Sequence, residues 1–272
     1  SYTAFKERFG IELNAQQEEA VQAIDGSVLL LAVPGSGKTT VLVNRLGYMI
    51  LECGIAPENI LTITYTDAAT KDMKQRFAKK FGDQYGERVE FRTINGISQK
   101  ILMFYGRQIG QKPYDIIDKK VQASLFKNIY KHVTKKFATE GDIKNIETGI
   151  NYVKNMRLSD EQISELKTDV ERFADIYNLY QSELRKMKLM DYDDQMVYAL
   201  VILQRYPEVL QYFRNLYKYI CVDEAQDTSR IQHDLIDLLA GENGNLFMVG
   251  DEDQSIFGFR AAYPQALLSF QN

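Results

Sequence analysis

The chain has 272 residues, of which 45% are hydrophobic and 26% charged, with only five prolines. This composition supports a buried core and excludes a disordered chain, and the length predicts one large domain or two small ones. Two cysteines and two histidines exclude a disulfide scaffold and a His-rich metal site. The longest apolar run, residues 28–33, is too short to span a bilayer, and no secretory signal is visible. We therefore expect a soluble protein of the reducing cytoplasm.

The formal net charge is −4, but the charges are unevenly distributed. Residues 119–157 contain nine Lys and Arg against three acidic residues, a local excess of six positive charges. Such a region could bind phosphate groups. A solvated helix surface gives the same pattern and is favoured on charge alone. The sequence leaves both interpretations open.

The first third of the chain alternates short apolar runs with amphipathic stretches. Residues 28–33, 61–65 and 89–92 have strand length and β-rich composition, and helical spacing follows the first run at Leu42, Leu46 and Met49. Two more runs of this kind occur late, at residues 219–222 and 246–249. Alternating strands and helices predict an α/β fold with a parallel sheet flanked by helices.

The texture changes between about residues 111 and 190. Apolar residues recur there at helical spacing, as in Leu125, Ile129 and Val133, and strand signals vanish. We therefore predict an inserted all-helical subdomain at 111–190, with residues 104–114 as the entry linker. The first and second parts of the α/β domain would then be residues 1–110 and 191–272.

A glycine-rich loop follows the first predicted strand. Its sequence AVPGSGKT, residues 32–39, matches GxxxxGK[ST] except that Ala32 replaces the first glycine. Gly35 and Gly37 allow backbone N–H groups to face phosphates, Lys38 would reach the β- and γ-phosphates, and Thr39 would hold Mg²⁺. A glycine-rich strand–helix turn arising by chance is the alternative, and the flanking strand and helix disfavour it. The predicted nucleotide contacts of this loop are Ala32, Val33, Pro34, Gly35, Ser36, Gly37, Lys38, Thr39 and Thr40.

A second polar segment follows the predicted strand at residues 219–222. Asp223 would hold Mg²⁺, and Glu224 would polarise the water that attacks the γ-phosphate. An acidic loop after a strand is common, so this segment alone does not decide between structure and catalysis. Together with the phosphate loop it predicts a nucleoside triphosphate hydrolase.

Several segments, in order along nearly the whole chain, resemble motifs of the superfamily 1 DNA helicases of the UvrD/Rep/PcrA kind. DEAQDT at 223–228 resembles motif II, and VGDEDQSIFGFR at 249–260 resembles motif III. LNAQQEEAV at 13–21 resembles the Q motif, residues 60–76 resemble motif Ia, and DYDD at 191–194 resembles the acidic segment that closes the helical insertion. The resemblance implies a RecA-like P-loop fold and the N-terminal motor half of an ATP-dependent 3′→5′ DNA helicase.

The resemblance also implies roles for single residues. Gln17 would hydrogen-bond the adenine, although a capping box with Asn14 at a helix start also explains it, and both can hold. Gln254 would contact the γ-phosphate, so the expected catalytic residues are Lys38, Glu224 and Gln254.

Single-stranded and duplex DNA are the implied macromolecular partners, with ATP and Mg²⁺ as cofactors and no membrane. Tyr65 and Phe259 would stack on bases, and Thr66 and Thr93 would bond the DNA backbone. Arg260 matches a family arginine whose target, phosphate, DNA or the motif itself, stays open.

Three departures limit the resemblance. Residues 67–70 read DAAT in place of the usual NKAA, and Asn95 replaces the usual histidine of motif Ib. Nothing in the chain resembles motifs IV, V and VI, so we expect a fragment that works with a second RecA-like domain. Two alternatives remain: the ATPase part of a RecB/AddA-type helicase–nuclease, or a module that by itself only binds nucleotide or DNA.

Overall fold

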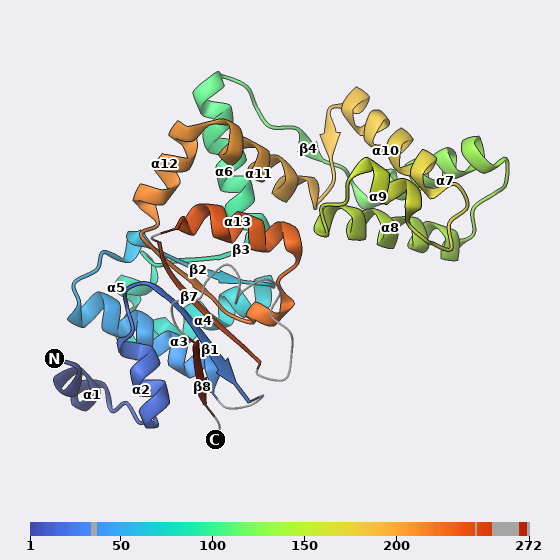
Figure 1. The fold of residues 1–272 in the computed structure, drawn as a ribbon. Coiled ribbons are helices and arrows are strands. Elements are labelled where there is room, and N and C mark those ends of the chain that lie inside the picture. Colours follow the sequence, from blue (N-terminus) through green and yellow to red (C-terminus); the bar gives the residue numbers. More distant parts are fainter. Residues whose placement is uncertain (34–36, 243, 252–266, 271–272) are drawn as a thin grey trace. The chain divides into compact units, whose positions relative to one another are not determined.

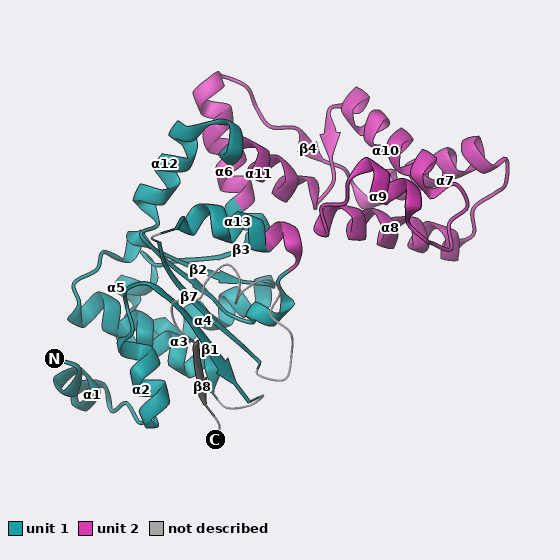
Figure 2. Ribbon diagram, in the orientation of Figure 1, with its two compact units in different colours: residues 1–97, 203–228, 233–272 teal, residues 98–202, 229–232 magenta. Residues whose placement is uncertain are grey.

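The computed structural model describes residues 1–33, 37–242, 244–251 and 267–270. The chain divides into two compact units, coloured separately in Figure 2. Unit 1 contains residues 1–97, 203–228 and 233–272, and unit 2 contains residues 98–202 and 229–232. In the described part of the chain, no helix combines the length and apolarity that crossing a membrane requires.

Unit 1 is built on a six-stranded sheet with the order β3-β2-β6-β7-β1-β8 (Figure 1). All of the strand pairs that hold it together are parallel. The strands are β1 (Ser27–Ala32), β2 (Ile60–Thr64), β3 (Glu90–Thr93), β6 (Tyr219–Val222), β7 (Asn245–Asp251) and β8 (Leu267–Phe270). This topology confirms the predicted RecA-like parallel α/β fold.

The central strands are buried on both faces. All five residues of β2 are buried, and in β1 only Leu31 is partly exposed. Helices must therefore cover both faces, and α3 and α4 lie on one side of the sheet with α13 on the other (Figure 1). Continuous apolar runs of this kind are typical of parallel strands, which explains why the sequence located five of the six.

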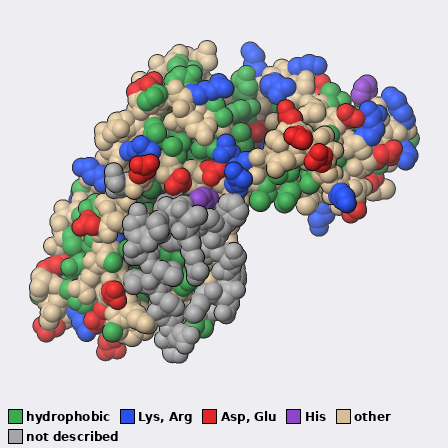
Figure 3. Space-filling view, in the orientation of Figure 1, with side chains coloured by type: hydrophobic (Ala, Val, Ile, Leu, Met, Phe, Trp, Pro, Cys, Tyr) green, Lys and Arg blue, Asp and Glu red, His purple; other side chains and the backbone are tan. Residues whose placement is uncertain are grey.

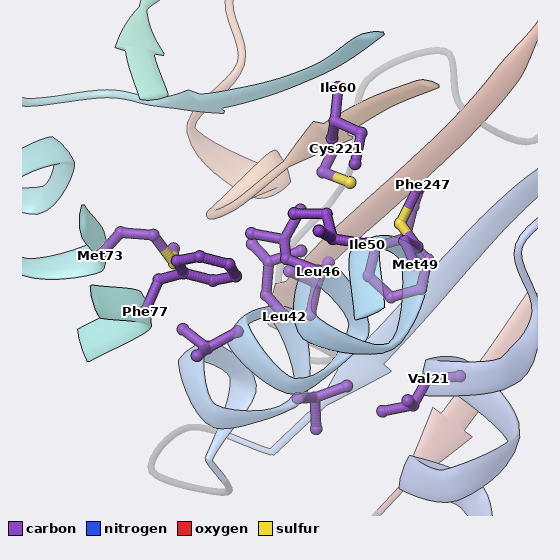
Figure 4. Close-up of a cluster of buried hydrophobic side chains, with 14 of the residues drawn as sticks. Val21, Leu42, Leu46, Met49, Ile50, Ile60, Met73, Phe77, Cys221 and Phe247 are labelled. Atoms are coloured by element: carbon purple, nitrogen blue, oxygen red, sulfur yellow. The ribbon is translucent and has the colours of Figure 1, made fainter. Parts of the chain in front are cut away.

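The helices of unit 1 form the outer layers of this sandwich. A shared hydrophobic cluster joins α2, α3 and α4 to the sheet, and Figure 4 shows part of it around Leu42 and Leu46. At one point α3 and α4 approach so closely that a side chain at Gly47 would overlap the ring of Phe81. The helical segments are α1 (Tyr2–Phe9), α2 (Ala15–Gln22), α3 (Lys38–Gly47), η1 (Tyr48–Glu52), η2 (Pro57–Asn59), α4 (Asp67–Phe81), α5 (Asp83–Gly86), α12 (Pro207–Leu216) and η3 (Ala225–Asp227).

Unit 2 is mainly helical and has its own core. Phe126, Ile150, Phe173 and Tyr180 are among the buried residues that α7, α8 and α10 contribute to it. Its helices are α7 (Lys119–Thr134), α8 (Glu140–Asn155), α9 (Asp160–Glu165) and α10 (Phe173–Met187). Three further helices, α6 (Ile94–Ile109), α11 (Asp194–Arg205) and α13 (Arg230–Ala240), include residues of both units.

Unit 2 differs from the expected all-helical insertion in one feature. Two short strands, β4 (Asp115–Ile116) and β5 (Leu189–Met190), pair in parallel and bring the beginning and end of the inserted segment together. A two-residue strand is too short to produce a periodic pattern, so the sequence could not reveal it.

The expected linker at 104–114 is also partly wrong, because α6 continues to Ile109. Gly106 explains why the helix was overlooked. The chain folds back over it, and a Cβ at Gly106 would lie 2.4 Å from the carbonyl oxygen of Gln111. This glycine is required by a close approach within the structure and does not end the helix.

The basic run at 119–157 is partly neutralised in the structure. Lys119 pairs with Glu147 and Lys136 with Glu171, both at the surface, whereas Lys154 is buried in an ion pair. Lys and Arg side chains, with acidic ones among them, appear on the surface of unit 2 (Figure 3). The surface therefore carries less positive charge than the sequence count suggests.

Candidate functional site

The candidate site lies at the carboxyl edge of the unit 1 sheet. Parallel strands place their carboxyl ends at the same edge, where ligands of open α/β sheets bind. The strand β1 ends at Ala32, beside Asp251 at the end of β7, and β6 on the other side of β7 leads into Asp223. Three segments far apart in the sequence therefore meet there.

The phosphate loop begins in the buried end of β1. Ala32 is fully buried and Val33 is partly exposed, while Pro34, Gly35 and Ser36 lie outside the described residues. Gly37 has φ 86° and ψ 33°, a left-handed conformation that favours glycine. It directly precedes Lys38, the first residue of α3, so the candidate phosphate-binding lysine lies at the positive end of a helix.

The Lys38 ammonium group is held by two carboxylates. Its Nζ lies 2.5 Å from Oδ1 of Asp251 and 3.1 Å from Oε2 of Glu224. Burial by itself lowers the pKa of Lys38, but the hydrogen bonds to Asp251 and Glu224 outweigh it and raise the pKa. Lys38 is therefore charged and held by carboxylates at the ends of β6 and β7.

The acidic segment after β6 has an uncommon backbone. Glu224 adopts φ 51° and ψ 47°, a left-handed conformation that costs free energy in a non-glycine residue and often occurs at functional sites. Its backbone N–H donates to Oδ1 of Asp223 at 2.9 Å. This turn lets Glu224 reach Lys38 while the Asp223 side chain stays buried.

Asp223 has an altered acidity. Burial, followed by the neighbouring charge of Glu224, raises its pKa to about 6. A nearby cation would reverse this effect by stabilising the carboxylate. The site therefore favours a positively charged ligand next to Asp223.

Asp251 and Gln226 belong to this cluster, although the sequence analysis gave neither a role. The Gln226 amide donates to Glu224 and, at 3.4 Å, to Oδ2 of Asp251, and its Oε1 accepts the Asp251 N–H at 3.1 Å. Asp251 ends a buried strand next to the phosphate loop, which is the same signal that identified Asp223. No sequence signal distinguished Gln226.

The donor groups at this edge suit a magnesium ion. Mg²⁺ prefers oxygen ligands and is held by one or two carboxylates together with phosphates of the substrate. Asp223 supplies a buried carboxylate whose pKa is raised by burial and by the charge of Glu224. The Thr39 hydroxyl group follows Lys38 in the first turn of α3. Thr40, the other hydroxyl residue of that turn, is exposed.

Gln17 occupies a fixed position in α2. Its Oε1 accepts the backbone N–H of Asn14 at 3.0 Å, and its own N–H donates to Oδ1 of Asn14 at 2.9 Å. The capping box considered from the sequence is thus present. Because a carbonyl oxygen has two lone pairs, this arrangement still permits contact with a base.

Three of the expected DNA contacts lie at the ends of β2 and β3. Thr64 and Thr93 are partners in the parallel register, so Tyr65, Thr66 and Thr93 occupy adjacent strand ends. All three side chains already accept or donate hydrogen bonds. Tyr65 bonds the Thr228 hydroxyl, Thr66 caps α4 through Ala69 N–H, and Thr93 accepts from Gly96 N–H.

The remaining expected site residues cannot be placed in this cluster. Gln254, Phe259 and Arg260 lie outside the described residues.

Comparison with known proteins agrees with this geometry. The family model described as the UvrD/REP helicase N-terminal domain matches residues 13–272. The ATP-dependent DNA helicase PcrA of Staphylococcus aureus is 36% identical over 263 residues, which cover 95% of this chain, and PcrA of Staphylococcus epidermidis is 35% identical over the same length. The chain spans 36% of the length of these relatives. It belongs to the UvrD/REP helicase N-terminal domain family.

Proposed function

We propose that this chain is the N-terminal motor part of an ATP-dependent DNA helicase that moves 3′→5′ on single-stranded DNA and unwinds duplex. The observation that carries the proposal is the position of Lys38 between Glu224 and Asp251 at the ends of three strands. A lysine that can bind the β- and γ-phosphates, next to a carboxylate that can orient the attacking water, is a recurring arrangement of P-loop NTPases.

In this proposal Lys38 leaves its carboxylate partners and binds the β- and γ-phosphates, which take over the compensation of its charge. Glu224 then accepts a hydrogen bond from the attacking water, and Gln254 contacts the γ-phosphate. Thr39 and Asp223 would hold Mg²⁺, whose charge offsets the negative charge that builds up on the phosphates. The backbone of residues 32–40 surrounds the phosphates, and Gln17 reads the adenine.

Single-stranded DNA would cross the adjacent strand ends. Tyr65 and Phe259 would stack on bases, while Thr66 and Thr93 would contact the sugar–phosphate backbone. Arg260 is assigned to the same region without a defined target. The parallel register of β2 and β3 supports this assignment because it places Thr66 and Thr93 on neighbouring strand ends.

A second RecA-like domain completes the proposed motor. It would supply the arginines that stabilise charge on the transferring phosphate, and closure of the two domains would move DNA across the stacking residues. The relatives, which are much longer than this chain, support this partner. We place the motor in the cytoplasm, because both cysteines are free thiols, as expected in a reducing compartment.

The nucleotide site is tested by Lys38→Ala. We expect the variant to keep its fold by circular dichroism but to lose some stability, because Asp251 and Glu224 lose their cation. It should lose measurable Mg·ATP binding in titration calorimetry. The matched control is Lys6→Ala, which removes a surface lysine paired with Glu18. Unchanged ATP affinity in Lys38→Ala would refute the phosphate-loop assignment.

The need for a second domain is tested by steady-state ATPase with and without oligo-dT. We expect this chain to bind ATP but to hydrolyse it very slowly, with little stimulation by DNA, because arginines acting in trans are worth about 10³–10⁵ in rate. Glu224→Gln serves as the blank. Turnover of several per second with strong DNA stimulation would show that the chain supplies the arginines itself or through a second copy.

A further inference from the structure

A fully buried arginine connects the elements of the nucleotide site. Arg45 lies on α3, two turns beyond Lys38, and is 2% exposed. Its Nη2 donates to the carbonyl oxygens of Ala23 at 2.8 Å and Ile24 at 3.4 Å, just after α2 ends. Its Nη1 lies 3.2 Å from the sulfur of Cys221 in β6.

The guanidinium group also packs against aromatic and sulfur-containing side chains. It lies over the ring of Phe247 in β7, 4.2 Å from the centroid, and its Nη1 is 3.4 Å from the sulfur of Met49. Figure 4 shows Cys221, Met49 and Phe247 in the same part of the buried cluster. One side chain thus joins α3 to α2, β6 and β7.

Burying the Arg45 guanidinium group in this way costs free energy. No carboxylate among the described residues pairs with Arg45, and burial lowers its pKa. A buried cation without an anion loses hydration that hydrogen bonds and a cation–π contact only partly replace. An apolar residue would fill the same space at lower cost, so the contacts of the guanidinium group must serve a purpose beyond filling the core.

The strongest of those contacts holds the carboxyl end of α2. The last carbonyl groups of a helix lack partners within the helix, and a cation that donates to them fixes that end. At the other end, the Asn14–Gln17 capping box orients the first turn. The capping box fixes Gln17 relative to its own helix, and Arg45 ties the carboxyl end of that helix to α3, so the position of Gln17 follows the position of α2.

We propose that Arg45 is a positioning residue that sets selectivity for adenine by anchoring α2 so that Gln17 meets the base. The inference rests on the proposed adenine contact of Gln17. Gln17 lies six residues before Ala23, about 9 Å along the helix at about 1.5 Å per residue. Pivoting α2 by about 10° around its carboxyl end would shift Gln17 by about 1.5 Å, which is enough to break a hydrogen bond.

The phosphates would not be affected by such a shift, because they meet the loop before α3 and Lys38. Recognition of the base would be affected, because a glutamine amide pairs with the N6–H donor and N7 acceptor of adenine. Guanine presents O6 in place of that donor. The inference therefore predicts a change in base selectivity without a change in triphosphate binding.

The experiment compares Arg45→Lys with the parent chain by calorimetric titration with Mg·ATP, Mg·GTP and Mg·tripolyphosphate. Lysine keeps the charge but loses the planar fork of donors with which Arg45 reaches both Ala23 and Cys221. We expect the preference for ATP over GTP to fall about tenfold, with tripolyphosphate affinity unchanged within twofold. Arg45→Met, which removes the buried charge and fits the same space, should show the same loss and guards against a failure of the lysine variant to fold.

Two controls separate this inference from its alternatives. Leu46→Val perturbs the neighbouring core position and keeps the Arg45 hydrogen bonds to Ala23 and Ile24, so it should lower stability while leaving the ATP preference intact. Gln17→Ala should lose the preference as Arg45→Lys does.

If Gln17→Ala loses the preference and both Arg45 variants keep it, the positioning role is refuted while the proposed nucleotide site stands. If Gln17→Ala keeps it, the adenine contact itself is wrong and the inference falls with it. Equal losses for all three ligands in the Arg45 variants would show that Arg45 acts on the fold alone.

Discussion

Lys154→Met should strongly destabilise unit 2. Lys154 lies in the last turn of α8 with its side chain 2% exposed, and its Nζ is 2.5 Å from Asp191 and 2.9 Å from Asp194. Both aspartates are buried, and Asp191 also accepts a hydrogen bond from the Tyr180 hydroxyl. Burial alone lowers the pKa of Lys154, but the charges of Asp191 and Asp194 outweigh it and raise the pKa. This ion pair ties α8 to the segment that follows β5.

The expected loss can be estimated from these distances. At an effective dielectric constant of about 20, each contact contributes about 6 kcal/mol before desolvation is counted. Desolvation of the three charged groups offsets most of that gain. The variant, however, retains the buried carboxylates without their cation, a change that typically costs about 3–5 kcal/mol. Since a domain is stable by only about 5–15 kcal/mol, Lys154→Met should remove a large part of the stability of unit 2.

Urea unfolding followed by circular dichroism measures the loss, and hydrogen exchange of α7, α8 and α10 assigns it to unit 2. The matched control is Lys119→Met, which removes an exposed lysine paired with Glu147 and should cost less than about 1 kcal/mol. Lys154→Met combined with Asp194→Asn should recover part of the loss because one uncompensated charge disappears. A cost below 1 kcal/mol for Lys154→Met alone would refute the reasoning.

Three further changes test other parts of the molecule. Burial and the charge of Asp191 raise the pKa of Asp193 to about 6, so the folded state binds this proton more tightly than the unfolded chain does. In urea titrations Asp193→Asn should therefore stabilise the protein more at pH 8 than at pH 5, and a gain that does not depend on pH would contradict this. Tyr65→Phe removes the hydrogen bond to the Thr228 hydroxyl and should cost about 1 kcal/mol of stability, with oligo-dT affinity unchanged in fluorescence anisotropy. A large loss of affinity would mean that the hydroxyl, and not the ring, contacts DNA. If the basic part of unit 2 contacts DNA phosphates, replacing Lys131, Lys135 and Lys136 together with glutamate should flatten the salt dependence of DNA binding. An unchanged slope would favour a solvated surface.

The sequence determined the elements that depend on local pattern. Parallel strands buried on both faces are continuous apolar runs, so five of the six sheet strands were visible before the structure was known. The phosphate loop and the acidic segment were equally visible, because both join a strand to a polar turn and need particular residue types at fixed spacing. Order along the chain then placed Lys38 and Glu224 in one predicted site.

Short or backbone-driven features were not determined in this way. The strands β4 and β5 have two residues each and leave no periodic pattern. The helix α6 continues through Gly106, which the sequence alone presents as a helix breaker. The strand β4 exists only through its pairing with β5, far along the chain, and the close approach at Gly106 depends on how the chain turns back at Gln111. Neither arrangement has a periodic pattern in the sequence.

The partners of the charged groups were decided only by tertiary structure. Asp251 lies 213 residues from Lys38, and Cys221 lies 176 residues from Arg45. The Lys154 that the sequence counted as part of a basic surface is buried against acids 37 and more residues away. Coulomb attraction and desolvation depend on distance in space and on exclusion of water. Separation along the chain determines neither of them before the elements pack together.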